Sequence, residues 1–461
     1  MKILLINPSF DYYSKYLLTG EPLSLAYLAA NLKKNGYEVN ILDAVAGDIK
    51  KNGSKWRYGL SKIEIINKIK EFNPDVVGIT CSFSLRNYFA VEMAKLVKRI
   101  NSKIITVIGG VHPTIFPLET IRIEEIDYII AGEGEESFLS LVRYLESANK
   151  TFKLFIDGCA YKNGDELKFI PKKNFIENLD LLSFPARELL PMEFYIKKPT
   201  VLYGLGMRRS ASIITSRSCP NRCSFCSMYL SHGPKWRSRS AENVFEEIKL
   251  LVEKYRVEEI FFMDDNLTFN KERVMILCDM ILRHRIKFRW NTPNGVAANS
   301  LDFDLASIMK KAGCANICIG VESGNDYIRN SVIKKGLARQ TINKALNACN
   351  RAKLPVVGFF ILGIPGENEY AFKDTLNMVK KFPFDMITTS FFTPFPGTKL
   401  YDDCVKDGYI AKDYWERIKQ FNAPVVETSD FNIKTLRERE KKIYYEFFKS
   451  NFLSLIYSII T

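Results

Sequence analysis

The sequence contains no uninterrupted apolar run of the roughly 20 residues that a membrane-spanning helix needs. Its closest approach is the tail from Phe447 to Ile460, which Lys449, Ser450 and Asn451 interrupt. The first apolar run is broken at Pro8, too early for a signal peptide. We therefore expect a cytoplasmic protein without a transmembrane segment. The tail is expected to be a docking helix, with a peripheral membrane contact as the alternative.

The chain also has no block of consecutive basic residues, although its net charge is +14. No recognisable nucleic-acid module accompanies this charge, so we expect no nucleic-acid partner. Two interpretations of the excess stay open. The basic residues form an ordinary solvated surface, or they form a face that docks an acidic electron donor or an anionic substrate.

Cysteine is present but unevenly placed. Seven of the ten cysteines are scattered among apolar residues, where they behave as small core side chains. Cys314 and Cys318 belong to this group because they lie beside a predicted buried strand. The absence of a secretory signal indicates a reducing compartment. The three remaining cysteines fall within eight positions, and this spacing requires a chemical explanation.

Up to residue 146, apolar runs alternate with helical periodicity, which predicts a doubly wound parallel sheet, flavodoxin-like or Rossmann-like. The expected strands are Lys2–Ile6, Val39–Leu42, Asp75–Thr80, Lys103–Ile108 and Ile126–Ile130. Ligands of this fold bind beyond the C-terminal strand ends, where small turns let a ligand approach the backbone. Such turns follow the first, third, fourth and fifth strands, although tight turns without a ligand would look the same.

Alternation resumes after a predicted hairpin and a proline-punctuated linker. Six strand–helix units then predict a partial (β/α)6 barrel of the triosephosphate isomerase kind, with its chemistry at the C-terminal strand ends. We expect four parts: a first domain at 1–148, the hairpin and linker at 149–204, the barrel at 205–398, and a helical C-terminal region at 399–461.

The three clustered cysteines directly follow the first barrel strand. Cys219, Cys223 and Cys226 are spaced so that one loop can place a thiolate on three irons of a cubane cluster. The fourth iron would then lack a protein ligand and could bind a small molecule. A zinc site completed by His232 and plain core cysteines are the alternatives.

This cysteine motif, with Phe225 before its last cysteine, resembles the signature of the radical S-adenosylmethionine (SAM) superfamily. Six further segments agree in order and position. They are Trp236–Val244, Phe262–Asn266, Trp290–Thr292, Ile319–Gly324, Gly358–Glu367 and Phe395–Thr398. The resemblance implies a [4Fe-4S] cluster that chelates SAM and cleaves it to a 5′-deoxyadenosyl radical.

The resemblance also implies SAM contacts at the matched positions. Asp264, Asp265 or Asn266 would bind the methionyl ammonium, and Glu322 and Ser323 the ribose or the methionyl end. Phe225 would pack beside the cluster and adenine, and the backbone from Gly363 to Pro365 would line the adenine site. A helix N-cap is the alternative role of Asp264 and Asp265.

The first domain contains the segments Pro22–Ala29, Gly109–Pro113 and Gly132–Glu135. With them it resembles the cobalamin-binding domain that accompanies many class B radical SAM enzymes. The implied cobalamin contacts are Ser82, Gly109, Gly110, His112, Gly132 and Glu133. The Asp-x-His-x-x-Gly pattern, whose histidine ligates cobalt in some cobalamin proteins, is absent. We therefore expect His112 to contact the corrin or its tail rather than to serve as that axial ligand. A domain that has lost the cofactor is the alternative.

Together the resemblances indicate a cobalamin-dependent radical SAM methyltransferase. Its substrate would be an unactivated carbon of a small or lipid-like molecule, and its electron donor a flavodoxin or ferredoxin. The alternatives are a cyclase or oxidative rearrangement enzyme of the same architecture and a non-catalytic cobalamin or redox sensor. A tRNA methylthiotransferase is disfavoured because only Cys81 precedes residue 150.

Overall fold

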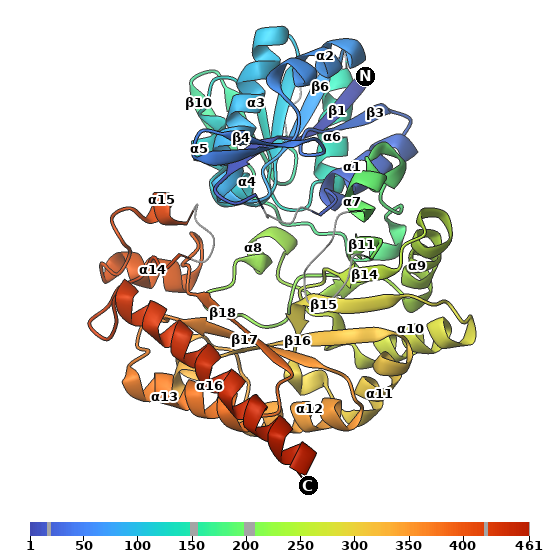
Figure 1. The fold of residues 1–461 in the computed structure, drawn as a ribbon. Helices are drawn as coiled ribbons and strands as arrows, with labels where there is room; N and C mark the ends of the chain where they lie inside the picture. The colour runs from blue at the N-terminus through green and yellow to red at the C-terminus, as the bar shows by residue number, and fades with distance from the viewer. Residues whose placement is uncertain (16–19, 148–154, 198–207, 419–422, 461) are drawn as a thin grey trace. The chain divides into compact units, whose positions relative to one another are not determined.

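The computed structural model describes the 461-residue chain apart from residues 16–19, 148–154, 198–207, 419–422 and 461, and apart from the side chains of 451–460. The chain divides into two compact units. The first comprises Met1–Lys198 together with Met228–Arg237, and the second comprises Pro199–Ser227 and Ser238–Thr461. Each unit has its own sheet, so each is described separately (Figure 1).

The first unit is built on a seven-stranded sheet in the order β10-β9-β8-β7-β6-β1-β3. Five of these strands are parallel. They are β1 (Lys2–Asn7), β3 (Glu38–Asp43), β6 (Val76–Thr80), β7 (Ile105–Gly109) and β8 (Tyr128–Ile130). Their apolar side chains are almost fully buried on both faces, as expected of a parallel sheet covered by helices. The five predicted strands and the doubly wound order are thus confirmed.

The chain order in this sheet reverses between β1 and β6, which places the topological switch point of the fold there. The crossover helices are α1 (Leu23–Lys34), α2 (Lys62–Phe72), α3 (Asn87–Ile100) and α6 (Glu135–Glu146). Helix α2 begins with a capping box, in which the side chain of Ser61 and that of Glu64 each accept a hydrogen bond from the other's backbone N–H.

Two features extend the first unit. The predicted hairpin is present as β9 (Cys159–Asn163) and β10 (Glu166–Phe169), and it adds two antiparallel strands beyond β8. A separate three-stranded sheet in the order β2-β5-β4 was not predicted from the sequence. Its strands are β2 (Phe10–Tyr12), β4 (Ile49–Asn52) and β5 (Lys55–Tyr58). Strand β4 is mostly exposed, whereas Phe10 of β2 and Tyr58 of β5 are buried in a small core of their own.

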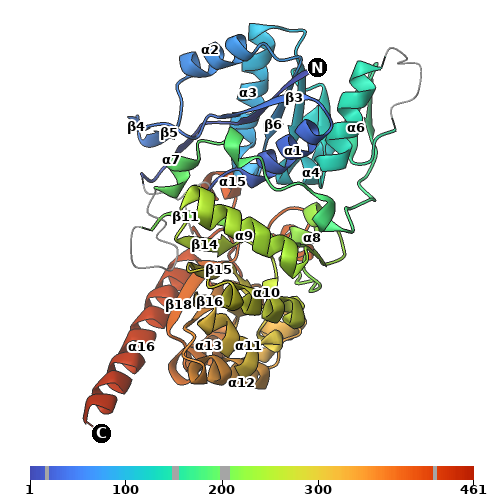
Figure 2. The same ribbon diagram turned by 90° about the vertical axis from the view of Figure 1, so that its right-hand side faces the viewer.

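The second unit is an open six-stranded parallel sheet in the order β11-β14-β15-β16-β17-β18, which follows the chain. The strands are β11 (Ser210–Ile213), β14 (Glu259–Phe262), β15 (Arg289–Val296), β16 (Cys314–Glu322), β17 (Val356–Leu362) and β18 (Met386–Phe391). Such an order, with a helix after each of the first five strands, is the predicted partial barrel (Figures 1 and 2).

The crossover helices of the second unit are α9 (Ala241–Tyr255), α10 (Lys271–Arg283), α11 (Phe303–Lys311), α12 (Arg339–Arg351) and α13 (Glu369–Lys381). Four of them begin at a Ser, Asn or Asp whose side chain accepts a backbone N–H of the first turn. Asn270 caps α10, so the N-cap role weighed for Asp264 and Asp265 belongs to another residue.

The C-terminal region contains α14 (Lys399–Lys406), α15 (Tyr414–Arg417) and α16 (Ile433–Ile460). Helix α16 runs along α13 and contacts β17 and β18, so it covers one side of the barrel (Figure 1). It is longer than the helix the sequence most clearly predicts, Leu436–Phe448. Among the residues the structure describes, no helix is long and apolar enough to cross a membrane.

Candidate active site

The three clustered cysteines lie on one loop at the C-terminal end of β11. Cys223 is buried, while Cys219 and Cys226 are partly exposed, and none of them is in a disulfide. Ser218, immediately before the loop, is fully buried with a φ of 69°. A non-glycine residue in this left-handed region is strained, and such strain persists where the surrounding structure enforces it. The loop is therefore held in a defined conformation.

Asp264, directly after β14, fixes the start of this loop. Its carboxylate accepts hydrogen bonds from the Thr215 hydroxyl at 2.8 Å, from the Thr215 backbone N–H and from the Ser216 hydroxyl. Burial raises the pKa of Asp264, and Arg273 and these hydrogen bonds oppose that rise. The carboxylate is thus engaged by the strand that leads into the cysteine loop.

Asn266 and Asp265 both act on the Cys219 thiol. The Asn266 Nδ2 atom is 4.0 Å from Cys219 Sγ, a distance at which an amide N–H can donate weakly to sulfur. Burial raises the pKa of the Cys219 thiol, and the charge of Asp265 raises it further. Of the three residues expected to bind the methionyl ammonium, these two border the cysteine loop.

Ser224 anchors the middle of the loop. Its backbone N–H donates to the Ile333 carbonyl at 2.8 Å, and its hydroxyl donates to the Val332 carbonyl at 2.7 Å. Its own carbonyl accepts from the Leu400 N–H at 3.0 Å, at the start of α14. Val332 ends η6 (Ile328–Val332), a single π-helical segment, and such segments are frequent at functional sites. The cysteine loop is therefore tied to the segment that follows β16.

Glu322, the last residue of β16, forms an ion pair with Lys335. Glu322 Oε1 lies 2.6 Å from Lys335 Nζ, and both side chains are largely buried. Strand pairing shifts register between Gly320 and Glu322, and Glu322 has a φ of 67°. A bulge of this kind re-aims a side chain. The sequence singled out Glu322 but missed Lys335, whose only signal is a Lys-Lys-Gly stretch after η6.

Lys335 influences the cysteines electrostatically. Burial raises the pKa of the Cys223 thiol to about 12, and the charge of Lys335 opposes this rise. Glu322 and the other two loop thiols raise it. Lys335 also opposes the rise at Cys219. The three thiols, Glu322 and Lys335 thus form one electrostatic group.

These residues fit an iron–sulfur cluster. The thiols are reduced, lie on one held loop, and have a cation beside them to compensate the negative charge of thiolates. Within the described ranges, no group of three or more Cys, His, Asp or Glu side chains is arranged to hold a single metal ion. In a cubane each thiolate instead takes its own iron.

The remaining expected SAM positions lie at the same edge of the parallel sheet. Ser323 is fully buried and its hydroxyl accepts the Asn325 N–H at 3.2 Å. Gly363, after β17, has a φ of 82° and donates its N–H to Glu367 Oε2 at 2.8 Å. Phe225 and Pro365 are half-buried. The second unit therefore presents every expected SAM position at the ends of β11, β14, β16 and β17.

In the first unit, the expected cobalamin positions follow β6, β7 and β8. The Ser82 hydroxyl lies 3.3 Å from that of Thr80. Gly110 has a φ of 120°, and a Cβ there would lie 2.5 Å from the Cys81 carbonyl, so glycine is required. His112 Nδ1 lies 3.1 Å from Ser84 Oγ. Burial lowers the pKa of His112, which favours the neutral ring.

Gly132 and Glu133 are placed differently from the other cobalamin candidates. Gly132 has a φ of 71° and donates its N–H to Thr114 Oγ1 at 2.8 Å. The Glu133 carboxylate forms a two-pronged ion pair with Arg237, with distances of 2.8 and 3.0 Å between nitrogens and oxygens. Both side chains are almost fully buried. Glu133 is therefore committed to a structural pair within the first unit.

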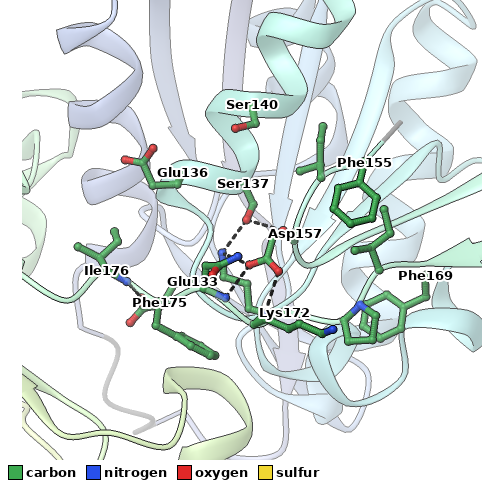
Figure 3. Close-up of a pocket in the computed structure, with 15 residues that line it drawn as sticks. Glu133, Glu136, Ser137, Ser140, Phe155, Asp157, Phe169, Lys172, Phe175 and Ile176 are labelled. Carbon is green, nitrogen blue, oxygen red and sulfur yellow. Dashed lines mark hydrogen bonds and ion pairs between the residues drawn. The ribbon is translucent and has the colours of Figure 1, made fainter. Parts of the chain in front are cut away.

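A cavity of about 700 Å³ lies next to Glu133, between α6 and the β9–β10 hairpin (Figure 3). Three of its polar lining residues, Ser137, Asp157 and Lys172, are paired with one another. Lys172 Nζ donates to Ser137 Oγ at 2.7 Å and lies 3.4 Å from an Asp157 carboxylate oxygen. Ser137 in turn donates to the Asp157 carbonyl at 2.6 Å. None of the positions expected to bind SAM lines this cavity.

Comparison with known proteins agrees with this geometry. Residues 213–379 match the family described as the radical SAM superfamily, and residues 12–142 match the B12 binding domain. An uncharacterised methyltransferase of Pyrococcus horikoshii is 32% identical over 97% of this chain and 92% of its own length. Cytidylyl-2-hydroxyethylphosphonate methyltransferase of Streptomyces wedmorensis is 30% identical over 89% of this chain and 82% of its own length.

The fold agrees with a solved structure. The radical SAM methyltransferase TsrM of Kitasatospora setae, with cobalamin and a [4Fe-4S] cluster bound, superposes with a TM-score of 0.68 at 16% identity. The superposition covers 88% of this chain and 75% of that chain. The chain therefore belongs to the radical SAM superfamily, and to those members that carry a B12 binding domain ahead of the radical SAM domain. The family's cofactors are a [4Fe-4S] cluster, SAM and, through the additional domain, cobalamin.

Proposed function

We propose that this protein is a cobalamin-dependent methyltransferase that modifies an unactivated carbon of a small or lipid-like molecule. One observation carries the proposal: a B12 binding domain and a complete three-cysteine site lie in one chain. Relatives that match nearly its whole length are named methyltransferases. A low-potential donor such as a flavodoxin or ferredoxin would supply the electrons.

The residues of the second unit have separable tasks in this proposal. Cys219, Cys223 and Cys226 would hold the cluster, and Asp265, Asn266, Glu322 and Ser323 would orient SAM at its open iron. Asp264 and Ser224 hold the cysteine loop in place. When bound, the cluster and SAM supply radical chemistry and cobalamin supplies methyl transfer.

The residues of the first unit would hold cobalamin. Gly109 and Gly110 would present a turn without side chains to a flat ligand. The conformation of Gly110, which packs against the Cys81 backbone, favours glycine there. His112 is half-buried and next to Ser84, and burial lowers its pKa, which suits a hydrogen bond to a corrin side chain. Glu133 is the exception among the expected contacts, because its carboxylate is held by Arg237.

Anaerobic reconstitution with cobalamin and SAM carrying a deuterated methyl group tests the proposal. We expect the protein to retain corrin after gel filtration, with a corrin absorbance spectrum, and label to be recovered in the corrin fraction by mass spectrometry. His112→Ala should weaken corrin retention about fivefold, the effect of losing one hydrogen bond of about 1 kcal/mol. His284→Ala, whose ring packs on Phe245 in the second unit, is the matched control.

The outcomes separate the candidate functions. A protein that cleaves SAM but retains no corrin would overturn the methyltransferase proposal and keep the radical one. A protein that retains corrin but transfers no label to it would favour the cyclase or rearrangement chemistry of the same architecture.

A further inference from the structure

Lys335 is a buried cation whose position the structure fixes independently of any ligand. Its side chain is 17% exposed, and its ammonium is paired to Glu322 at 2.6 Å. The backbone N–H of Lys335 donates to the Arg329 carbonyl at 3.0 Å. The fully buried Arg329 guanidinium in turn donates to the Ser323 and Leu337 carbonyls, each at 2.6 Å. Hydrogen bonds to the backbone and side chain of Arg329 thus hold the segment that carries Lys335.

The same segment is joined to the cysteine loop. Ser224, the residue after Cys223, donates hydrogen bonds to the carbonyls of Val332 and Ile333. Lys335 lies only two residues beyond Ile333, so its position is linked to the cysteine loop. Glycine at position 320 leaves room for the pair, because a Cβ there would lie 2.5 Å from Glu322 Oε1 and 2.8 Å from Lys335 Nζ. Three separate structural devices therefore hold one positive and one negative charge whose electrostatic influence reaches the Cys223 thiol.

We propose that the Lys335–Glu322 pair sets the reduction potential of the cluster held by Cys219, Cys223 and Cys226. A cubane bound by three thiolates is anionic and becomes more so when it gains an electron. A nearby positive charge stabilises the reduced form and raises the potential, while a nearby negative charge lowers it, and local charge is one of the known determinants of cluster potentials. Lys335 is a positioning residue in this role, because it acts through the cluster's environment.

The inference rests on the radical SAM site and not on methyl transfer to a carbon. It therefore survives if the methyltransferase proposal fails, and it fails separately if the potential does not respond to these charges. The step concerned is the gain of one electron by the oxidised cluster from an external low-potential donor.

The test is an anaerobic redox titration of the full-length, cluster-reconstituted protein without SAM, with titanium(III) citrate as the donor and the electron paramagnetic resonance signal of the reduced cluster as the readout. Lys335→Met should make the reduction potential of the cluster more negative. At a given applied potential, the ratio of reduced to oxidised cluster should fall on the order of tenfold, which corresponds to a shift of about 59 mV for one electron. Glu322→Gln should shift it in the opposite direction.

Three further variants keep the test decisive. Lys335→Arg retains the charge and should retain the potential, and the Lys335→Met/Glu322→Gln double variant should fall between the two single variants. Lys334→Met removes an exposed neighbouring lysine and should change nothing. Iron content per chain, measured for each variant, reports whether the cluster is intact.

The sign pattern separates an electrostatic role from a structural one. The inference is overturned if Lys335→Met titrates like Lys334→Met, or if Lys335→Met and Glu322→Gln shift the potential in the same direction. If Lys335→Met does not assemble a cluster, an unchanged potential in Glu322→Gln overturns it equally.

Discussion

The hydroxyl of Ser224 donates to the Val332 carbonyl at 2.7 Å, and this bond joins the cysteine loop to the end of a π-helical segment 108 residues later in the chain. Ser224 lies between Cys223 and Cys226, so its position fixes the loop from within. The barrel strands position both ends of the contact.

Ser224→Ala removes this hydrogen bond and leaves a partly buried carbonyl without it, at a cost of about 1 kcal/mol. We expect the reconstituted variant to lose iron to a chelator about fivefold faster than the unchanged protein. Ser331→Ala, at an exposed serine of η6, is the control and should lose iron at the original rate. Equal rates in the two variants would show that the Ser224 contact does not hold the loop.

Replacing glycine by alanine should have different consequences at positions 320 and 324. In Gly320→Ala the new methyl group meets only the tips of the Glu322 and Lys335 side chains. The fold should persist, while SAM affinity falls several-fold, measured by equilibrium binding. In Gly324→Ala the methyl group would lie 2.5 Å from Thr375 Cα, which is backbone, and stability should fall by about 1–3 kcal/mol. Urea unfolding distinguishes them, and comparable losses of stability would contradict this account.

Glu367 makes stability depend on pH. It is fully buried, its Oε1 atom has no hydrogen-bond partner, and burial raises its pKa from 4.5 to about 7. The Gly363 N–H and Arg439 oppose that rise. Between these two values the folded chain holds a proton that the unfolded chain has released. The free energy of unfolding therefore falls as pH rises from about 4.5 to about 7, by an amount on the order of 3 kcal/mol.

Glu367→Gln removes this titration. We expect its urea midpoint to change less between pH 5 and pH 8 than that of the unchanged protein. Glu369→Gln is the control, because Glu369 is 54% exposed and lies 3.6 Å from the same Arg439. A pH dependence of Glu367→Gln identical to that of the unchanged protein would rule out this source of the slope.

The Arg237–Glu133 pair is a stability element of the first unit. Arg237→Met leaves a buried carboxylate without its partner, which costs about 3–5 kcal/mol. Lys235→Met breaks an ion pair to Glu177 whose side chains are 74% and 70% exposed, and it should cost about 1 kcal/mol or less. Urea unfolding of both variants, monitored by circular dichroism, tests the contrast. A small loss in Arg237→Met would show that the pair is dispensable.

The sequence predicts both sheets because parallel strands buried on two faces leave continuous apolar runs. The helices of the second unit follow the predicted strand–helix alternation, and side-chain caps mark the starts of α9 and α13. The β2-β5-β4 sheet escaped prediction because a strand such as Ile49–Asn52, with three exposed polar residues, has no apolar alternation.

The site was predictable only in part. The cysteine spacing and the strand-end motifs are local patterns, so they can be found in sequence alone. Lys335 acquires its position from the bulge at β16, the π-helical turn and the contacts of Arg329, which are tertiary features. Glu133 pairs with Arg237, 104 residues later in the chain, and no local sequence pattern predicts a contact over that separation.

The central claim is that Cys219, Cys223 and Cys226 hold a cluster that reductively cleaves SAM. The most direct measurement is anaerobic formation of 5′-deoxyadenosine by the reconstituted, reduced protein, compared with Cys226→Ala and with Cys278→Ala, which alters a fully buried core cysteine. We expect product from the unchanged protein and from Cys278→Ala, and none from Cys226→Ala. Undiminished product from Cys226→Ala, or no product from cluster-replete protein, would contradict it.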